Sequence, residues 1–239
     1  MVTLFRGQCE HFRAECMIPL RDTVRSRSVP VVNYLLIITC GIVFVFELSL
    51  GPRLGSFLRT YAVIPAGIAE SYHLGVIHPR AYFSLVSSMF LHGGWVHLIG
   101  NMLYLYVFGD NIEDRLGHFG YLIFYVLCGI TSALTQVFFS QDSLVPVIGA
   151  SGAIAGVLGA YFLLYPRARI LTMIPLVIFF PVVELSAFFF LGFWFMMQFL
   201  QAALASGTEL SGGVALWAHA GGFVAGAVFL PVFLLLRPK

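Results

Sequence analysis

The feature that most constrains this fold is a series of apolar stretches, several of which match the thickness of a bilayer's hydrocarbon core. A transmembrane helix needs about 20 mostly apolar residues. The chain is 59% hydrophobic and only 10% charged, whereas a soluble domain carries about 25% charged residues. We therefore expect an all-α polytopic membrane helix bundle, surrounded by the lipid bilayer.

Six transmembrane helices are predicted from the positions of these stretches. They cover residues 31–50, 95–108, 119–139, 151–165, 185–205 and 215–235. The segment between the first two contains three arginines and an apolar piece too short to span, so we expect a membrane-embedded or interfacial first loop. A second short apolar piece covers residues 170–180. The chain is thus divided into an N-terminal tail, residues 1–30, and a six-span domain, residues 31–236.

Positive charge orients this topology. With the N-terminus in the cytoplasm, ten Lys and Arg residues fall on the cytoplasmic side and three on the outer side, in keeping with the positive-inside rule. Both termini are therefore expected to be cytoplasmic. The first apolar run has no cleavage site after it, so we expect it to remain as an anchor. The minimal six-span chain with its short N-terminal tail and the arginine-biased loops suit a bacterial inner membrane.

Charge and cysteines exclude several partners. The net charge of +2 without a basic cluster argues against a nucleic-acid partner. Cys9 and Cys16 flank His11, but their spacing matches no zinc pattern. Cys40 and Cys128 lie in apolar runs and are interpreted as small core residues. No metal or cofactor is expected.

Two polar residues in apolar runs carry the chemistry. Ser151 lies within Gly149-Ala-Ser-Gly152 at the start of the fourth span, and His219 lies near the start of the sixth. Serine is a potential nucleophile, and histidine is the residue that most often activates one. An ionisable side chain in a membrane indicates a functional site. Taken singly, each has an ordinary alternative: a small-residue packing surface, or a structural hydrogen-bond partner or proton carrier.

The predicted topology brings this serine and histidine to one depth. The fourth and sixth spans run in the same direction, so both residues lie slightly below the outer surface. The fourth span carries Gly152-x-x-x-Gly156 and the sixth carries Gly222-x-x-x-Gly226. Glycines four residues apart allow two helices to approach closely. If these faces meet, the serine and histidine become neighbours.

The start of the second span adds hydrogen-bond donors. His97 and Asn101 are four residues apart and share one helical face. Both side chains are suitable donors to a developing oxyanion, although they could instead bond neighbouring helices. A metal site at His92 and His97 lacks the His-Glu-x-x-His pattern. The second, fourth and sixth spans hold no Asp or Glu between their ends, so the sequence indicates a dyad rather than a triad.

These motifs together resemble the rhomboid family of intramembrane serine proteases. The matching residues, which follow the family's order and spacing, are His92-Gly93, His97-x-x-x-Asn101, Gly109-x-x-x-Glu113-x-x-x-Gly117, Gly149-Ala-Ser151-Gly152 and Ala218-His219-x-x-Gly222-x-x-x-Gly226. The chain resembles a minimal, bacterial-type rhomboid with six spans.

The resemblance implies a role for each of these residues. Ser151 is expected to be the nucleophile and His219 the general base and acid. The oxyanion hole is expected to contain His97, Asn101 and the Ser151 N–H, with Gly149, Gly152, His92 and Gly222 shaping the site. The expected substrates are transmembrane helices of membrane proteins, admitted past the phenylalanine-rich fifth span without metal or ATP.

The chain departs from the family pattern in two places. Phe83-Ser84 replaces a frequent Trp-Arg pair in the first loop, and Ala155 replaces an aromatic residue that stacks on the catalytic histidine in many members. Another group must therefore hold the His219 ring. The sequence is also compatible with two other functions: a proton-coupled transporter that uses the intramembrane histidines, and a non-catalytic membrane chaperone. The sequence leaves the oligomeric state open.

Overall fold

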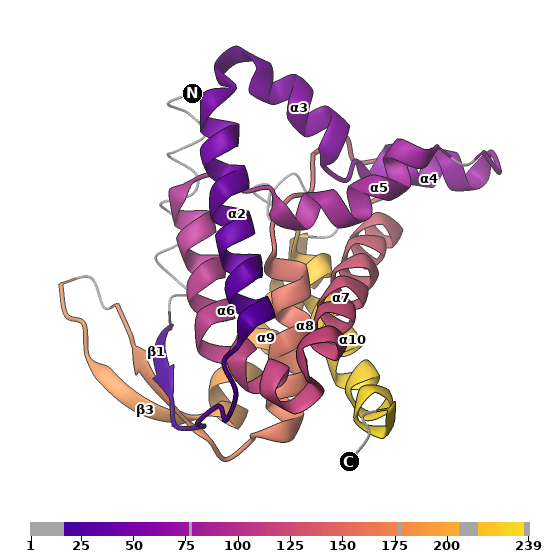
Figure 1. Ribbon diagram of the computed structural model, residues 1–239. Coiled ribbons are helices and arrows are strands. Elements are labelled where there is room, and N and C mark those ends of the chain that lie inside the picture. Colours follow the sequence, from indigo (N-terminus) through magenta and orange to yellow (C-terminus); the bar gives the residue numbers. More distant parts are fainter. Residues whose placement is uncertain (1–16, 77, 176–177, 206–214, 237–239) are drawn as a thin grey trace.

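The computed structural model describes residues 17–76, 78–175, 178–205 and 215–236, which form a helix bundle with a small sheet at one end (Figure 1). Six helices make up the bundle in the described part of the chain. They are α2 (Val31–Ser49), α6 (Trp95–Leu116), α7 (His118–Phe139), α8 (Ser151–Leu164), α9 (Ala187–Ala205) and α10 (Leu216–Leu236).

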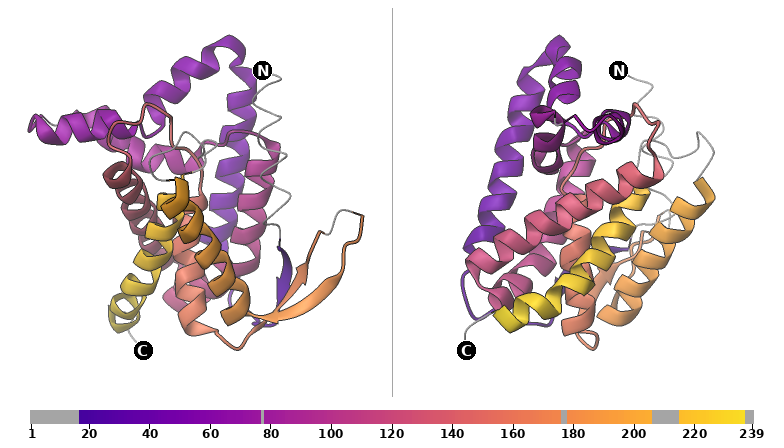
Figure 2. Two further views of the ribbon diagram at one scale, coloured as in Figure 1. Left: turned by 180° about the vertical axis from the view of Figure 1, so that it is seen from behind. Right: turned by 90° about the vertical axis from the view of Figure 1, so that its right-hand side faces the viewer.

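Helix α8 is the centre of the bundle. It contacts α6, α7, α9 and α10, and all of its residues from Gly152 to Tyr161 are buried. A helix that is apolar on every side is either buried among other elements or surrounded by lipid, and these contacts place α8 among other helices. Figure 2 shows α7 and α10 side by side, with α9 on the other side of α10. The first residue of α8 is therefore held from several directions.

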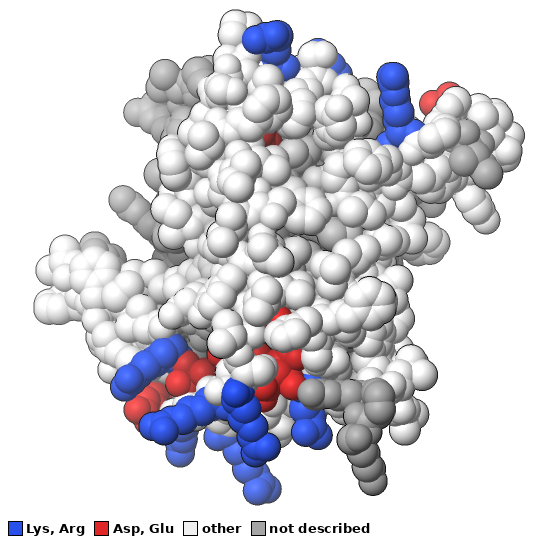
Figure 3. Space-filling model, in the orientation of Figure 1, with Lys and Arg blue, Asp and Glu red and all other residues white. Residues whose placement is uncertain are grey.

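The bundle has the dimensions and charge distribution of a membrane protein. Four helices are long and apolar enough to cross a bilayer, namely α2, α7, α10 and residues 187–204 of α9. Nearly all charged side chains visible in Figure 3 lie at the two ends of the molecule, with an uncharged band between them. The predicted polytopic membrane helix bundle is thus confirmed. Helix α8 is shorter, with 14 residues, and α6 carries Asp110, Glu113 and Asp114 in its last turns.

The predicted first loop is mostly helical. It contains the 3-10 turns η1 (Gly51–Arg53) and η2 (Ser88–Phe90) and three short helices, α3 (Leu54–Tyr61), α4 (Pro65–His73) and α5 (Pro79–Ser87). Helix α4 projects sideways from the bundle (Figure 1). Proline occupies the first turn of α4 and of α5, where its missing N–H costs no helical hydrogen bond. This loop joins the ends of α2 and α6 at one end of the bundle.

Two helix boundaries differ from the sequence prediction by two residues or more. Helix α6 continues to Leu116, eight residues beyond the predicted end at Phe108, because its charged last turns lie at the charged end of the bundle. The fifth helix begins at Ala187 rather than at residue 185.

A three-stranded antiparallel sheet was not predicted. Its strands are β1 (Ile18–Asp22), β2 (Arg169–Met173) and β3 (Val182–Ser186), in the order β1-β2-β3. Thus part of the N-terminal tail pairs with the segment interpreted as a short apolar piece. Asp22 in β1 accepts hydrogen bonds from Asn111 of α6 (2.9 Å) and from the Tyr161 hydroxyl of α8. These bonds attach the tail to the bundle.

The Gly109-x-x-x-Glu113-x-x-x-Gly117 motif joins α2 to α6. The buried Glu113 carboxylate accepts the Val32 and Asn33 N–H groups at 2.9 and 2.7 Å, which caps the start of α2. A side chain on Gly109 would collide with the Asn33 amide. Gly117 has a φ of +76°, which suits glycine at the turn into α7. The motif is therefore accounted for by packing and capping at the end away from α4.

Candidate active site

The side chains of Ser151 and His219 meet between α8 and α10. The Ser151 Oγ lies 2.8 Å from the His219 Nε2, a hydrogen-bond distance, although 68 residues separate the two in sequence. Both side chains are partly buried. Ser151 is the first residue of α8, so its backbone N–H has no partner within the helix.

The glycine faces of α8 and α10 bring these residues together. A Cβ on Gly222 would collide with the carbonyl oxygen of Gly152, and one on Gly226 would collide with that of Gly156. The two backbones are thus in direct contact, as glycines four residues apart permit. On another side of α8, a Cβ on Gly152 would collide with the Ser132 hydroxyl. That hydroxyl donates to the Ala218 carbonyl at 2.8 Å and links α7 to the residue before His219.

Gly149 brings the His97 ring to the serine. It has a φ of +122°, and its N–H donates to the Ser88 carbonyl at 2.9 Å. A Cβ at this position would lie 2.7 Å from the His97 Nε2 and 3.5 Å from the Ser151 Oγ. Only glycine combines this backbone conformation with so close an approach.

The tautomer of His97 follows from its second nitrogen. The Gly93 N–H donates to the His97 Nδ1 at 3.4 Å. A neutral imidazole that accepts at Nδ1 carries its proton on Nε2. The Nε2–H is therefore a donor on the side where Gly149 and the Ser151 hydroxyl lie.

Asn101 supplies a second donor from the next turn of α6. Its side chain is 8% exposed, and its Nδ2 has no hydrogen-bond partner in the described part of the chain. A buried donor without a partner costs free energy, of order 1–3 kcal/mol. A buried donor without a partner is expected where the acceptor arrives with a ligand.

His92 lies behind the His97 ring. The two ring centroids are 5.2 Å apart, the His92 N–H donates to the buried Glu47 carboxylate at 3.1 Å, and the His92 Nδ1 lies 3.2 Å from the Phe90 carbonyl. Burial, and to a lesser extent the neighbouring His97, lowers the pKa of His92 to about 4. His92 is therefore neutral at physiological pH, and it contributes to the site by packing against the His97 ring.

The structure adds two groups that sequence reasoning missed. The Gln198 Oε1 of α9 lies 2.7 Å from the His219 Nδ1, and the Trp194 ring centroid is 6.0 Å from that of His219. The available signal was a pair of glutamines, Gln198 and Gln201, in an otherwise apolar helix, because polar groups in membrane helices are rare and functional.

The position of Ala155 explains why no aromatic residue holds His219 from α8. Ala155 is fully buried, and its Cβ would lie 3.2 Å from a Cβ on Gly222. An aromatic ring has no room where α8 and α10 are in backbone contact. The ring is flanked from α9 instead.

The sequence also predicts a polar cavity, lined by Ser87, Ser88, His92 and residues 206–213, through which water reaches the site from outside. The Ser87 hydroxyl donates to the Tyr61 carbonyl at 2.7 Å, and Ser88 contributes its carbonyl to Gly149.

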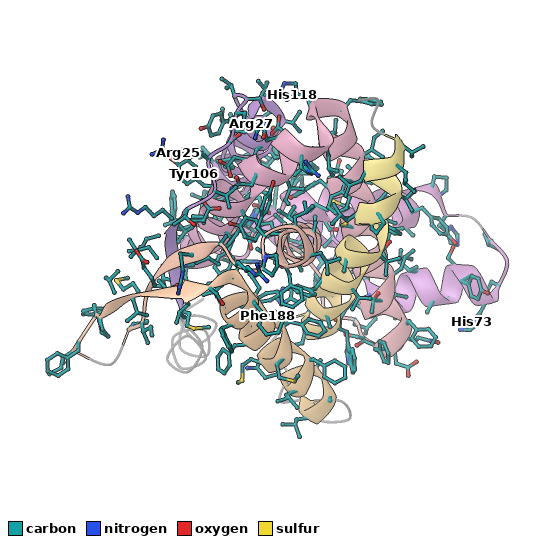
Figure 4. The ribbon with its side chains drawn as sticks, turned by 90° about the horizontal axis from the view of Figure 1, so that it is seen from below. Arg25, Arg27, His73, Tyr106, His118 and Phe188 are labelled. Atoms are coloured by element: carbon teal, nitrogen blue, oxygen red, sulfur yellow. The ribbon has the colours of Figure 1, made fainter. Side chains whose placement is uncertain are left out.

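Two further histidines lie away from the site. His73 lies on the projecting α4 and His118 at the start of α7, far from each other in Figure 4. Residues 206–213, expected to line a polar cavity, and Cys9, His11 and Cys16 fall outside the described residues. No group of three potential metal ligands occurs among those described.

The fold and site define a class of membrane helix bundle in which a serine-histidine pair lies beneath one end. A family model described as a rhomboid domain matches residues 79–236, which is more than half of the chain. The chain belongs to the rhomboid family, whose members are generally intramembrane serine proteases.

Curated relatives agree with this assignment. The chain is 34% identical over 104 residues to Rhomboid-like protein 11, chloroplastic, from Arabidopsis thaliana (44% of this chain, 36% of the relative). It is 30% identical over 136 residues to Rhomboid protein 1, mitochondrial, from Saccharomyces cerevisiae (55% and 36%). It is 30% identical over 164 residues to RHOMBOID-like protein 5 from Arabidopsis thaliana (65% and 45%). The matches thus span less than half of each relative's length, and these plant and yeast names give no support to the predicted bacterial inner membrane.

Proposed function

We propose that this protein is an intramembrane serine endopeptidase that uses Ser151 and His219 as a catalytic dyad. The observation that carries the proposal is the 2.8 Å hydrogen bond between the Ser151 Oγ and the His219 Nε2. A nucleophile and its base must lie within hydrogen-bond reach of each other. In this reading the serine attacks a peptide carbonyl while the histidine accepts its proton.

The second half of the mechanism is stabilisation of the tetrahedral intermediate. We propose that its oxyanion accepts hydrogen bonds from the His97 Nε2–H, the Asn101 Nδ2 and the Ser151 N–H. The support is the neutral His97 tautomer set by Gly93 and the absence of another partner for the Asn101 donor in the described residues. One donor of this kind contributes about 2.7–4 kcal/mol to catalysis. His219 then protonates the leaving amine, and water hydrolyses the acyl-enzyme.

The proposed substrates are transmembrane segments of other membrane proteins. They enter sideways from the lipid, and they must unwind locally because helical carbonyls are hydrogen-bonded and shielded. The exposed phenylalanines of α9, such as Phe189 and Phe193 at 71% and 55% exposure, form an apolar surface on that route. This proposal requires neither a metal nor ATP.

The topology completes the proposal. The catalytic domain is residues 31–236, with β1 of the tail attached to it. The chain crosses the membrane six times. Two of the six spans are the shorter α8 and α6, whose last turns are charged. Both termini lie on the arginine-rich side. On that topology the dyad is reached from the opposite face. Location in a bacterial inner membrane stays a prediction from the minimal six-span chain and its arginine-biased loops.

The transporter and chaperone functions lack such an observation. A transporter would use the histidines to relay protons, but His219 is engaged with Ser151 and Gln198. A non-catalytic chaperone has no need for a serine and a histidine in hydrogen-bond contact. The protease therefore accounts for more of the geometry.

The direct test is proteolysis in reconstituted liposomes. The wild type is incubated with a model single-span substrate, and the products are mapped by mass spectrometry. Cleavage within or at the edge of the span that disappears in Ser151→Ala and in His219→Ala supports the proposal. Cleavage that persists in Ser151→Ala would contradict it.

A further inference from the structure

We propose that Gln198 is a positioning residue for the dyad: its side-chain carbonyl fixes the His219 tautomer that can accept the Ser151 proton. The inference rests on the proposed protease function and deepens it. Within the described residues no carboxylate contacts the His219 ring, and the Gln198 Oε1 at 2.7 Å occupies the place where serine hydrolases with a triad use one.

The tautomer follows from the chemistry of the two partners. An amide oxygen only accepts hydrogen bonds, so the His219 Nδ1 must carry the proton and donate it. The Nε2 then has a free lone pair, directed at the Ser151 hydroxyl at 2.8 Å. The opposite amide orientation would present a donor to Nδ1 and move the ring proton to Nε2. A ring of that kind cannot accept from the serine.

Burial makes the Gln198 side chain an unusual choice for a mere packing residue. It is 7% exposed within a stretch of α9 that is otherwise apolar except for Gln201. Burying an amide without hydrogen bonds costs roughly 1–3 kcal/mol in proteins. A methionine would fill a similar volume without that cost. The polar head is thus accounted for by its contact with His219.

The acceptor comes from a third helix. Ser151 and His219 belong to α8 and α10, whereas Gln198 and Trp194 belong to α9. Helix α9 is held to these two by stacked rings: Phe188 on Phe162 at 5.3 Å, and Phe195 on Phe223 at 4.7 Å. The productive state of the dyad therefore depends on where α9 lies.

The first test compares Gln198→Met, Gln198→Glu and a control, Gln201→Met, which removes a glutamine one turn away on the same helix. Rates of substrate cleavage are measured in liposomes across the pH range in which histidine titrates. Gln198→Met should lower kcat about 10- to 100-fold with little change in KM, because the ring loses its orientation. Gln201→Met should stay close to the wild type.

The glutamate variant separates positioning from packing. Its carboxylate still accepts from Nδ1 and also stabilises a protonated imidazole. Cleavage should therefore be retained, with the acid limb of the pH profile moved to higher pH by about one unit or more. If Gln198→Met cleaves like the wild type, or if both variants lose activity equally with an unmoved profile, the proposal is overturned. Thermal unfolding of each variant identifies losses caused by misfolding.

A second measurement needs neither a Gln198 variant nor activity. In protein labelled with ¹⁵N-histidine, NMR reports which ring nitrogen carries the proton, and His219→Gln identifies the signal. A single form protonated on Nδ1 is expected. A proton on Nε2, or averaging between the two forms, would overturn the proposal even if the wild type is an active protease. An inactive wild type with the Nδ1 form would instead contradict the proposed function.

Discussion

The His219 Nε2 lies 2.8 Å from the Ser151 Oγ because α8 and α10 approach until glycine meets backbone carbonyl. The reactive contact and the packing contact are parts of one helix interface. Changes in the packing should therefore affect the chemistry.

Replacing Gly222 tests the link between packing and chemistry. A Cβ there would collide with the Gly152 carbonyl, so Gly222→Ala should push α10 away from α8. We expect a loss of stability of about 1–3 kcal/mol and a larger loss of cleavage than stability alone explains. Thermal unfolding and cleavage are measured together. Gly41→Ala is the control, because nothing lies within 4 Å of a Cβ on Gly41; equal behaviour of the two variants would refute the prediction.

Asn101→Ala removes a buried donor of α6 that has no partner among the described residues. If the Asn101 Nδ2 binds the oxyanion, kcat should fall about 10²- to 10³-fold with little change in KM. Stability should not fall, because no hydrogen bond of this atom is lost from the described structure. Steady-state cleavage kinetics provide the measurement. A rise in KM at constant kcat would instead indicate that Asn101 binds the substrate in its ground state.

Gly149→Ala tests the turn before the serine. Alanine disfavours a φ of +122°, and its Cβ would lie 2.7 Å from the His97 Nε2. We expect cleavage to fall at least about 10-fold, since a small displacement of catalytic groups has a cost of this size. Gly100→Ala, next to Asn101 on α6, has open space around the new Cβ and should keep its activity. Retained activity in Gly149→Ala would show that the close approach of His97 is not required.

His92 predicts a pH dependence of stability. Its pKa is lowered to about 4 by burial, with a smaller effect of His97, whereas an unfolded histidine has a pKa of about 6.5. Between these values the unfolded state binds more protons, so stability falls as pH decreases from about 6.5 to about 4. His92→Gln should flatten this decline by on the order of 1–3 kcal/mol. Unfolding of the wild type and the variant, measured across that pH window, checks this prediction. An unchanged slope of stability against pH would contradict the assignment of the decline to His92.

Much of the bundle could be predicted because a membrane imposes simple rules. Apolar length located the helices, and glycines at a spacing of four correctly indicated that α8 and α10 meet. The end of α6 was missed because Asp110 to Leu116 no longer follow the apolar rule, although the helix continues. Strand β1 was missed because its pairing is non-local: Ile18–Asp22 has no alternating pattern of its own, and its partner β2 lies far along the chain.

The site was predictable to the extent that its residues lie in local motifs. Gly149 to Gly152 and His97 with Asn101 are short patterns whose spacing has a structural meaning. Gln198 has no motif around it, and its role depends on which way α9 faces. Because Ala155 replaces an aromatic residue, the sequence could raise the question of what holds the His219 ring. Only the arrangement of three helices gives a candidate answer.

The most direct test of the central claim is covalent labelling of the serine. The wild type in detergent is treated with a fluorophosphonate, and the modified residue is identified by mass spectrometry, with a rhomboid of known activity as the reference. We predict labelling at Ser151, absent in Ser151→Ala and strongly reduced in His219→Ala. An unlabelled wild type under conditions that label the reference, or label on another serine, would contradict the Ser151-His219 dyad.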